Sequence, residues 1–132
     1  MDLKDLTPKS DTFEVKLVHP NTNEPLMNPD DTPMTITMWA PHSKPYKDVL
    51  HQQTNKRLTQ VSEGGSFELK SEDLEESTLQ TLIHTTKMWN ITFDGEKPPC
   101  TVEKCEEVYT EVFWMKTQIE QALTDFLNFS IA

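Results

Sequence analysis

The stretch TFEVKLV, residues 12–18, decides the fold class at the start of the chain. Apolar and polar residues alternate along it with a period of two, the pattern of a strand that buries one face. The stretch MTITMWA, residues 34–40, repeats this alternation and is rich in Thr and Ile, which suit a pleated surface. Turn-forming clusters at residues 19–23 and 28–33 separate the two stretches, and residues 25–27 fit a short returning strand. We therefore expect a small antiparallel β-meander here.

After residue 40 the apolar spacing changes to the three or four residues that is typical of helices. Ser43 is a favoured helix N-cap, so a helix is expected to begin there and to stop at Gly64-Gly65. Ser71 is followed closely by four acidic residues, which favour the positive N-terminal end of a helix dipole. This pattern predicts a second helix that runs to about Met88.

The last part of the chain predicts one or two further helices. Thr101 provides an N-cap, and the apolar residues after it recur every three or four positions as far as Phe126. The pattern leaves open whether this segment is one long helix or two helices broken near Phe113-Trp114.

These elements together predict a single α+β domain. We expect residues 1–11 to be a flexible arm and residues 12–132 to be the domain. Within it, residues 12–40 form the β-meander, and residues 43–132 are mostly helical, with three to four helices. The chain of 132 residues is long enough for one domain with a proper hydrophobic core.

The formal net charge is -10, with 12 Lys and Arg against 22 Asp and Glu. Residues 1–70 carry a net charge of -2 and residues 71–132 a net charge of -8. Binding to nucleic acid phosphates requires clustered basic residues, and a membrane span requires about 18 consecutive apolar residues. The sequence has neither, so we expect no nucleic acid and no membrane as partner. Two cysteines are too few for a disulfide-rich secreted protein, and the start of the sequence lacks a secretory signal pattern. Both observations favour the cytoplasm as the compartment.

The sequence contains no group of residues with catalytic or metal-binding spacing. Cys100 and Cys105 are five positions apart, but a zinc site needs four ligands, and none of the four histidines joins them in a motif. The carboxylate pair Asp30-Asp31 lies in a loop flanked by prolines, where solvated turn residues are expected. We therefore expect no catalytic residue, no metal, no cofactor and no enzymatic activity.

Large aromatic and Met side chains are the remaining candidates for a functional site, because such residues are enriched at protein interfaces. Phe113, Trp114 and Met115 would point around most of a helix circumference, so either one of them faces a partner or the helix breaks there. The candidate partner-binding residues are Trp39, Trp89, Phe113, Trp114, Met115, Phe126 and Phe129.

The second half of the chain has a characteristic order of short motifs. An extended stretch at Trp89 is followed by DGEKPPC (94–100), by Thr101 at the start of an acidic helix, and by QIEQA (118–122) in a last helix that reaches Phe129. This order resembles the small tail proteins of long-tailed bacteriophages, in particular the tail assembly chaperones. The resemblance covers most of the chain.

The resemblance implies a non-enzymatic protein made in the cytoplasm of an infected host bacterium. Proteins of that family bind the tape measure protein and tail tube subunits during tail assembly, and self-association is a further expectation. Two alternatives remain open at this stage. One is a structural virion subunit of the tail or head–tail junction, assembled through the edge of its N-terminal sheet. The other is an acidic inhibitor that mimics DNA, since the excess charge of residues 71–132 is suited to that role.

Overall fold

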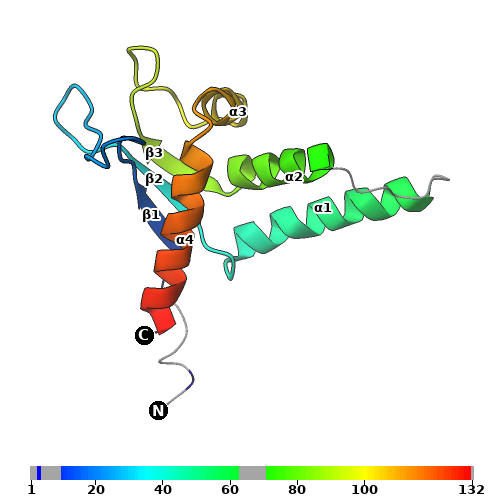
Figure 1. Cartoon of the computed structure of the whole chain (residues 1–132). Coiled ribbons are helices and arrows are strands. Elements are labelled where there is room, and N and C mark those ends of the chain that lie inside the picture. The colour runs from blue at the N-terminus through cyan, green and yellow to red at the C-terminus, as the bar shows by residue number, and fades with distance from the viewer. Residues whose placement is uncertain (1–2, 4–9, 63–70, 132) are drawn as a thin grey trace.

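The computed structural model describes residues 3, 10–62 and 71–131. Most of the expected arm and the expected helix stop at Gly64-Gly65 lie outside the described residues. The elements along the described part of the chain are β1 (Thr12–Lys16), β2 (Thr35–Trp39), α1 (Lys44–Ser62), α2 (Ser71–His84), β3 (Thr86–Asn90), α3 (Val102–Glu111) and α4 (Met115–Ile131) (Figure 1). Three antiparallel strands and four helices make this an α+β fold, which confirms the predicted class.

The sheet has the strand order β1-β2-β3, with β2 in the centre. β1 and β2 pair antiparallel in the register Val15 to Ile36, as their alternating sequences predict. The third strand is β3, which reaches the sheet only after α1 and α2. The segment expected to return at residues 25–27 makes only isolated bridges, from Pro25 to Val18 and from Met27 to Pro33. Proline has no N–H to donate, so a continuous ladder cannot form there.

α2 ends at His84, whereas the sequence pattern predicted a helix to about Met88. The Oγ1 atom of Thr86 donates to the Leu82 carbonyl at 2.7 Å, and the Oγ1 atom of Thr85 donates to the Thr81 carbonyl at 2.6 Å. These hydroxyls occupy carbonyls at the end of the helix. The next residues can then pair with the free edge of β2, which gives them the backbone hydrogen bonds that a longer helix would have provided.

Two predicted helix starts are confirmed by their capping geometry. The Oγ atom of Ser43 accepts a hydrogen bond from the Tyr46 N–H at 3.4 Å at the start of α1. The Oγ1 atom of Thr101 accepts from the Lys104 N–H at 3.2 Å at the start of α3. Each cap satisfies one of the backbone donors that a helix leaves unpaired at its first turn.

The hydrophobic core lies between one face of the sheet and the helices α2, α3 and α4. Every second residue of the two N-terminal strands points into it, in keeping with the period-two pattern. The buried apolar residues are Phe13, Val15, Leu17, Ile36, Met38, Ala40, Leu82, Ile83, Ile91, Cys105, Val108, Tyr109, Met115 and Ile119.

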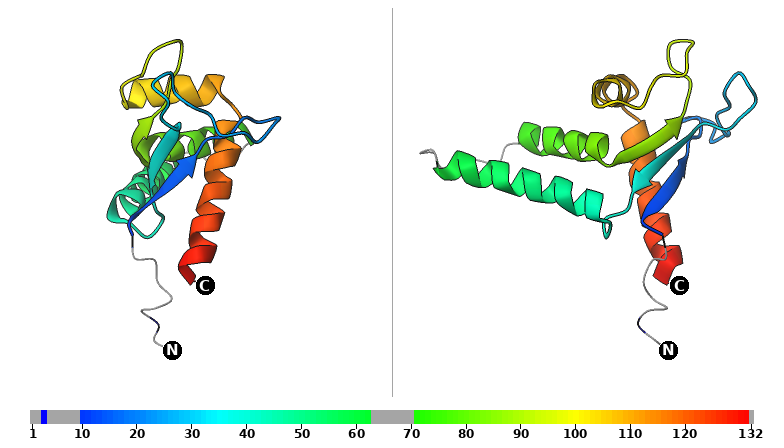
Figure 2. Two further views of the ribbon diagram at one scale, coloured as in Figure 1. Left: turned by 90° about the vertical axis from the view of Figure 1, so that its left-hand side faces the viewer. Right: turned by 180° about the vertical axis from the view of Figure 1, so that it is seen from behind.

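The helices take different positions around this core. α1 lies beside α2, and the two project together to one side of the sheet (Figure 1). The amide of Gln53 joins them, because its Nε2 atom donates to Thr81 Oγ1 at 2.7 Å. α4 runs alongside β1 in the opposite direction, so that its C-terminal end lies near the start of the strand (Figure 2). Among the described residues, no helix is long and apolar enough to cross a membrane.

Candidate partner-binding site

The free edge of β1 is the first component of the candidate site. In an antiparallel ladder, the backbone N–H and C=O groups of one residue point to the partner strand and those of the next residue point away. The Leu17 N–H donates to the Met34 carbonyl at 3.0 Å, so the odd-numbered residues of β1 face β2. The backbone groups of Glu14 and Lys16 therefore face outward, away from the sheet.

The side chain of Gln118 on α4 covers one end of this edge. Its Oε1 atom accepts from the Val18 N–H at 3.0 Å, and its Nε2 atom donates to the Val18 carbonyl at 2.8 Å. A primary amide that donates and accepts in this way replaces the peptide group of a neighbouring strand. At the other end, the Thr12 N–H donates to the Oγ atom of Ser10 at 3.3 Å. Among residues 3, 10–62 and 71–131, the edge is thus engaged at Val18 and at the Thr12 N–H and is open at Glu14 and Lys16.

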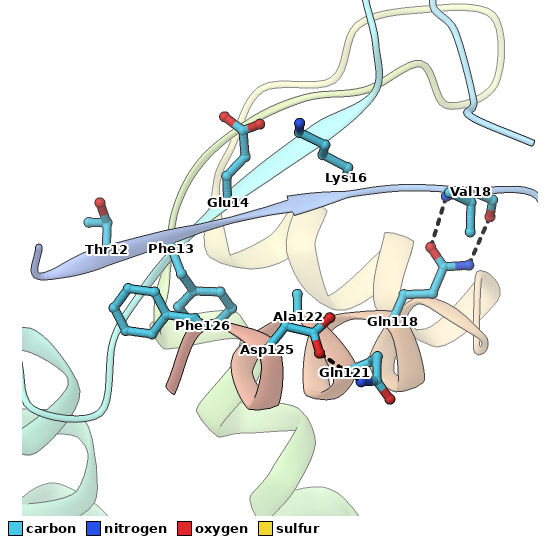
Figure 3. Close-up of a pocket in the computed structure, with 10 residues that line it drawn as sticks. All are labelled: Thr12, Phe13, Glu14, Lys16, Val18, Gln118, Gln121, Ala122, Asp125 and Phe126. Atoms are coloured by element: carbon cyan, nitrogen blue, oxygen red, sulfur yellow. Dashed lines mark hydrogen bonds between the residues drawn. The ribbon is translucent and has the colours of Figure 1, made fainter. Parts of the chain in front are cut away.

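A hollow of about 600 Å³ lies between this edge and α4 (Figure 3). Phe13, Ala122 and Phe126 supply its apolar wall, and the rings of Phe13 and Phe126 stack with their centroids 5.6 Å apart. Gln121 and Asp125 form a polar rim, with the Gln121 amide donating to the Asp125 carboxylate at 3.1 Å. An apolar wall, a polar rim and unpaired strand groups are the features by which proteins bind an additional strand.

Among the predicted partner-binding residues whose side chains the structure describes, Phe126 is the one that lies in this hollow. Trp39 lies on the opposite face of the sheet, half-buried, with the ammonium of Lys87 4.9 Å from its ring centroid. Trp89 is half-buried against the core, where its Nε1 atom donates to the Pro98 carbonyl at 2.9 Å and its ring meets Tyr109 edge-on. The structure therefore does not bring the predicted aromatic residues together.

Residues 112–114 form the turn between α3 and α4, and Met115 is the first residue of α4, so the helix does break near Phe113-Trp114. Met115 is only 2% exposed and Trp114 is half-buried against the core, whereas the side chain of Phe113 is 79% exposed. This turn is thus a second apolar surface, separate from the hollow. The side chain of Phe129 lies outside the described residues.

The two cysteines lie near each other at the start of α3, and burial raises the pKa of both thiols. The pKa of Cys105 rises to about 12, because burial and the neighbouring Cys100 both disfavour its thiolate. A thiol with a raised pKa is a weak nucleophile at neutral pH. In residues 3, 10–62 and 71–131, no cluster of three or more His, Cys, Asp or Glu side chains is arranged to hold a metal ion.

Gln118 is the residue of this site that the sequence did not reveal. It lies 100 positions from Val18, and although it opens the motif QIEQA (118–122), nothing in that motif indicates a contact with the edge of β1. A comparison with protein-family models, curated proteins and solved structures found no match to this chain.

Proposed function

We propose that this chain is a non-enzymatic tail assembly chaperone of a long-tailed bacteriophage, which binds the tape measure protein and tail tube subunits in the host bacterial cytoplasm. The order of motifs from Trp89 to the last helix is the sequence basis of this proposal. A protein in this role needs an apolar surface for its client and enough charge to keep the complex in solution.

The observation that carries the proposal is the exposure of Phe113. Its ring is 79% exposed while the two residues that follow it turn inward. Burying a Phe side chain against a partner stabilises the complex by about 1.5–3 kcal/mol. An apolar helix of a client is a suitable partner, because an exposed aromatic ring at a helix turn can pack against its apolar stripe.

The charge around Phe113 supports the same role. α3 ends at Glu111, two residues before Phe113, and carries exposed carboxylates at Glu103, Glu106, Glu107 and Glu111. Like charges on the surface of a complex oppose further association. A chaperone with this arrangement binds its client through the turn and keeps the bound complex soluble through α3.

The test is co-expression of the Phe113→Ser variant with the tape measure protein encoded by the same phage. We expect the affinity for the tape measure protein to fall about tenfold to a hundredfold, so less of it remains soluble. Met88→Ser is a matched control, because Met88 is also a large exposed apolar residue, 55% exposed, but lies on β3. Equal solubility of the tape measure protein with Phe113→Ser and with the unchanged chain would contradict the proposal.

A structural subunit of the tail or of the head–tail junction is the second candidate. The observation that favours it is the open edge of β1 at Glu14 and Lys16, since strand edges can join neighbouring subunits in a ring. Purified phage particles distinguish the two candidates. A chaperone is absent from them, whereas a structural subunit is present in a fixed number of copies.

A further inference from the structure

The open part of the β1 edge presents four backbone groups, the N–H and C=O of Glu14 and of Lys16. Of the neighbouring outward-facing groups, the N–H and C=O of Val18 are engaged by Gln118, and the N–H of Thr12 is engaged by Ser10. A strand added at this edge is therefore confined to a short ladder centred on Val15.

An identical strand fits this short ladder. Two copies of β1 related by a twofold axis through Val15 run antiparallel, with Glu14 of each copy opposite Lys16 of the other. Residues that face each other in this way exchange two hydrogen bonds, from each N–H to the opposite C=O. The two Glu14–Lys16 pairs thus use the N–H and C=O groups of Glu14 and Lys16 in both copies and leave the bonds to Gln118 and Ser10 intact.

The side-chain charges select the same register. The side chains of Glu14 and Lys16 are exposed and lie on the face of the sheet opposite the core. In the register centred on Val15, a carboxylate lies directly opposite an ammonium at both pairs, which stabilises strand pairing. The two nearest registers that preserve the hydrogen-bonding pattern place Glu14 opposite Glu14 or Lys16 opposite Lys16. Like charges opposite each other destabilise those registers.

The hollow beside β1 lies on the side of the strand from which a second copy would approach. A twofold axis perpendicular to the sheet places both copies of α4 on the same face of the combined sheet. The half-buried residues Ala122 and Phe126, which line the hollow, then face the second copy. The open backbone groups of the sheet edge and the charge pattern of β1 therefore both fit a second copy of this chain.

We propose that two copies of this protein form a twofold dimer through β1, in which Glu14 of each copy pairs with Lys16 of the other in a continuous six-stranded sheet. This dimer does not involve the turn at Phe113 and does not depend on the proposed function.

Charge reversal tests the register. Sedimentation velocity over a range of protein concentrations gives the dimer dissociation constant for the unchanged chain and for Glu14→Lys, Lys16→Glu and the double variant. We expect each single variant to weaken dimerisation at least about tenfold and the double variant to return to within about threefold of the unchanged chain. Glu106→Lys on α3 is the matched control, with an exposed carboxylate reversed outside β1 and no expected effect.

The same set of variants separates pairing from general charge repulsion. Glu14→Lys makes the chain less acidic and Lys16→Glu makes it more acidic, so net charge alone would change dimerisation in opposite directions. A monomeric unchanged chain over the whole concentration range would overturn the proposal. The proposal would also be overturned if the single variants dimerised like the unchanged chain. The same holds if the double variant folded but had a dimer dissociation constant as high as that of either single variant.

Cysteine cross-linking gives an independent measurement of the register. Residues opposite each other in a hydrogen-bonded antiparallel pair have Cα atoms about 5.5 Å apart, a distance that a disulfide spans. In a Cys100→Ser background, which removes the exposed native thiol, a mixture of Glu14→Cys and Lys16→Cys chains should oxidise to the mixed dimer. Preferential formation of either self-linked dimer would refute the register centred on Val15.

Discussion

Substitution of Gln118 is the most direct test of the structure of the site. The side chain of Gln118 joins α4 to the end of the β1 edge through two hydrogen bonds to the backbone of Val18, at 3.0 and 2.8 Å. Gln118→Ala removes both bonds and leaves a backbone N–H and a C=O of the edge strand without this partner. We therefore expect the variant to fold and to be less stable than the unchanged chain.

The size of the expected loss in stability follows from where the two hydrogen bonds lie. One hydrogen bond contributes about 0.5–1.5 kcal/mol net, and a buried group left unsatisfied costs more. Val18 is only half-buried, so water can replace part of what is lost. The expected loss in the free energy of unfolding is therefore about 1–2 kcal/mol. For a chain of this size, 1 kcal/mol corresponds to roughly 4 °C in Tm, so Tm should fall by about 4–8 °C.

Urea unfolding followed by circular dichroism measures this loss. Gln121→Ala is the matched control, because Gln121 lies one turn further along α4, is exposed and donates only to the neighbouring Asp125 side chain. We expect the control to change stability by less than about 0.5 kcal/mol. If the two variants have the same free energy of unfolding, the Gln118 amide does not close the edge of β1 and the reasoning is refuted.

Two further predictions concern titrating groups. Iodoacetamide at pH 8 should alkylate Cys100 well before Cys105 in the folded protein, because Cys105 is buried and its pKa is raised to about 12. Mass spectrometry measures the two alkylation rates, and equal rates would contradict this prediction. Hydrogen bonds from Lys97 and Thr32 lower the pKa of Asp30 from 3.8 to about 2, so the stability they provide is present above about pH 4 and is lost as the pH falls to about 2. Asp30→Asn should therefore lower the urea midpoint at pH 6 more than at pH 2, and an equal effect at both pH values would exclude this linkage.

The parts of the fold that the sequence predicted are those set by local periodicity and capping. The alternation at residues 12–18 and 34–40 predicted β1 and β2, and Ser43 and Thr101 predicted the starts of two helices. These signals are readable because a strand face and a helix cap each depend on residues within a few positions. The break between α3 and α4 was predicted as one of two alternatives.

The strand at residues 86–90 was predicted only in part: an extended stretch was expected at Trp89, but residues 86–88 were assigned to the preceding helix, because the start of the strand depends on a distant partner. Its sequence, TKMWN, lacks a clear alternation and follows the helical pattern of α2. The free edge of β2, about 50 positions earlier in the chain, accepts it through the register Thr37 to Met88. Pairing with β2 thus determines that these residues form a strand and do not extend the helix. A local sequence pattern gives no information about such pairing.

In the candidate site, too, the sequence predicted some features and the tertiary structure determined the others. Phe126 was predicted as an aromatic residue suited to an interface, but its position in the hollow beside β1 depends on the packing of α4 along that strand. The exposure of Phe113, rather than of Trp114 or Met115, follows from the direction of the turn between two helices. Aromatic composition identified the candidates and did not determine which of them face solvent.

By itself, the sequence determined the α+β class, the first two strands, the helix caps and the acidic charge, because each depends on composition or on neighbours along the chain. Only the tertiary structure decided which part of β1 stays open. α4 packs along β1 and brings Gln118 to Val18, 100 positions away, so the edge is closed there and open at Glu14 and Lys16. A strand edge is defined by what lies beside it, and that neighbour is set by the packing of segments distant in the sequence.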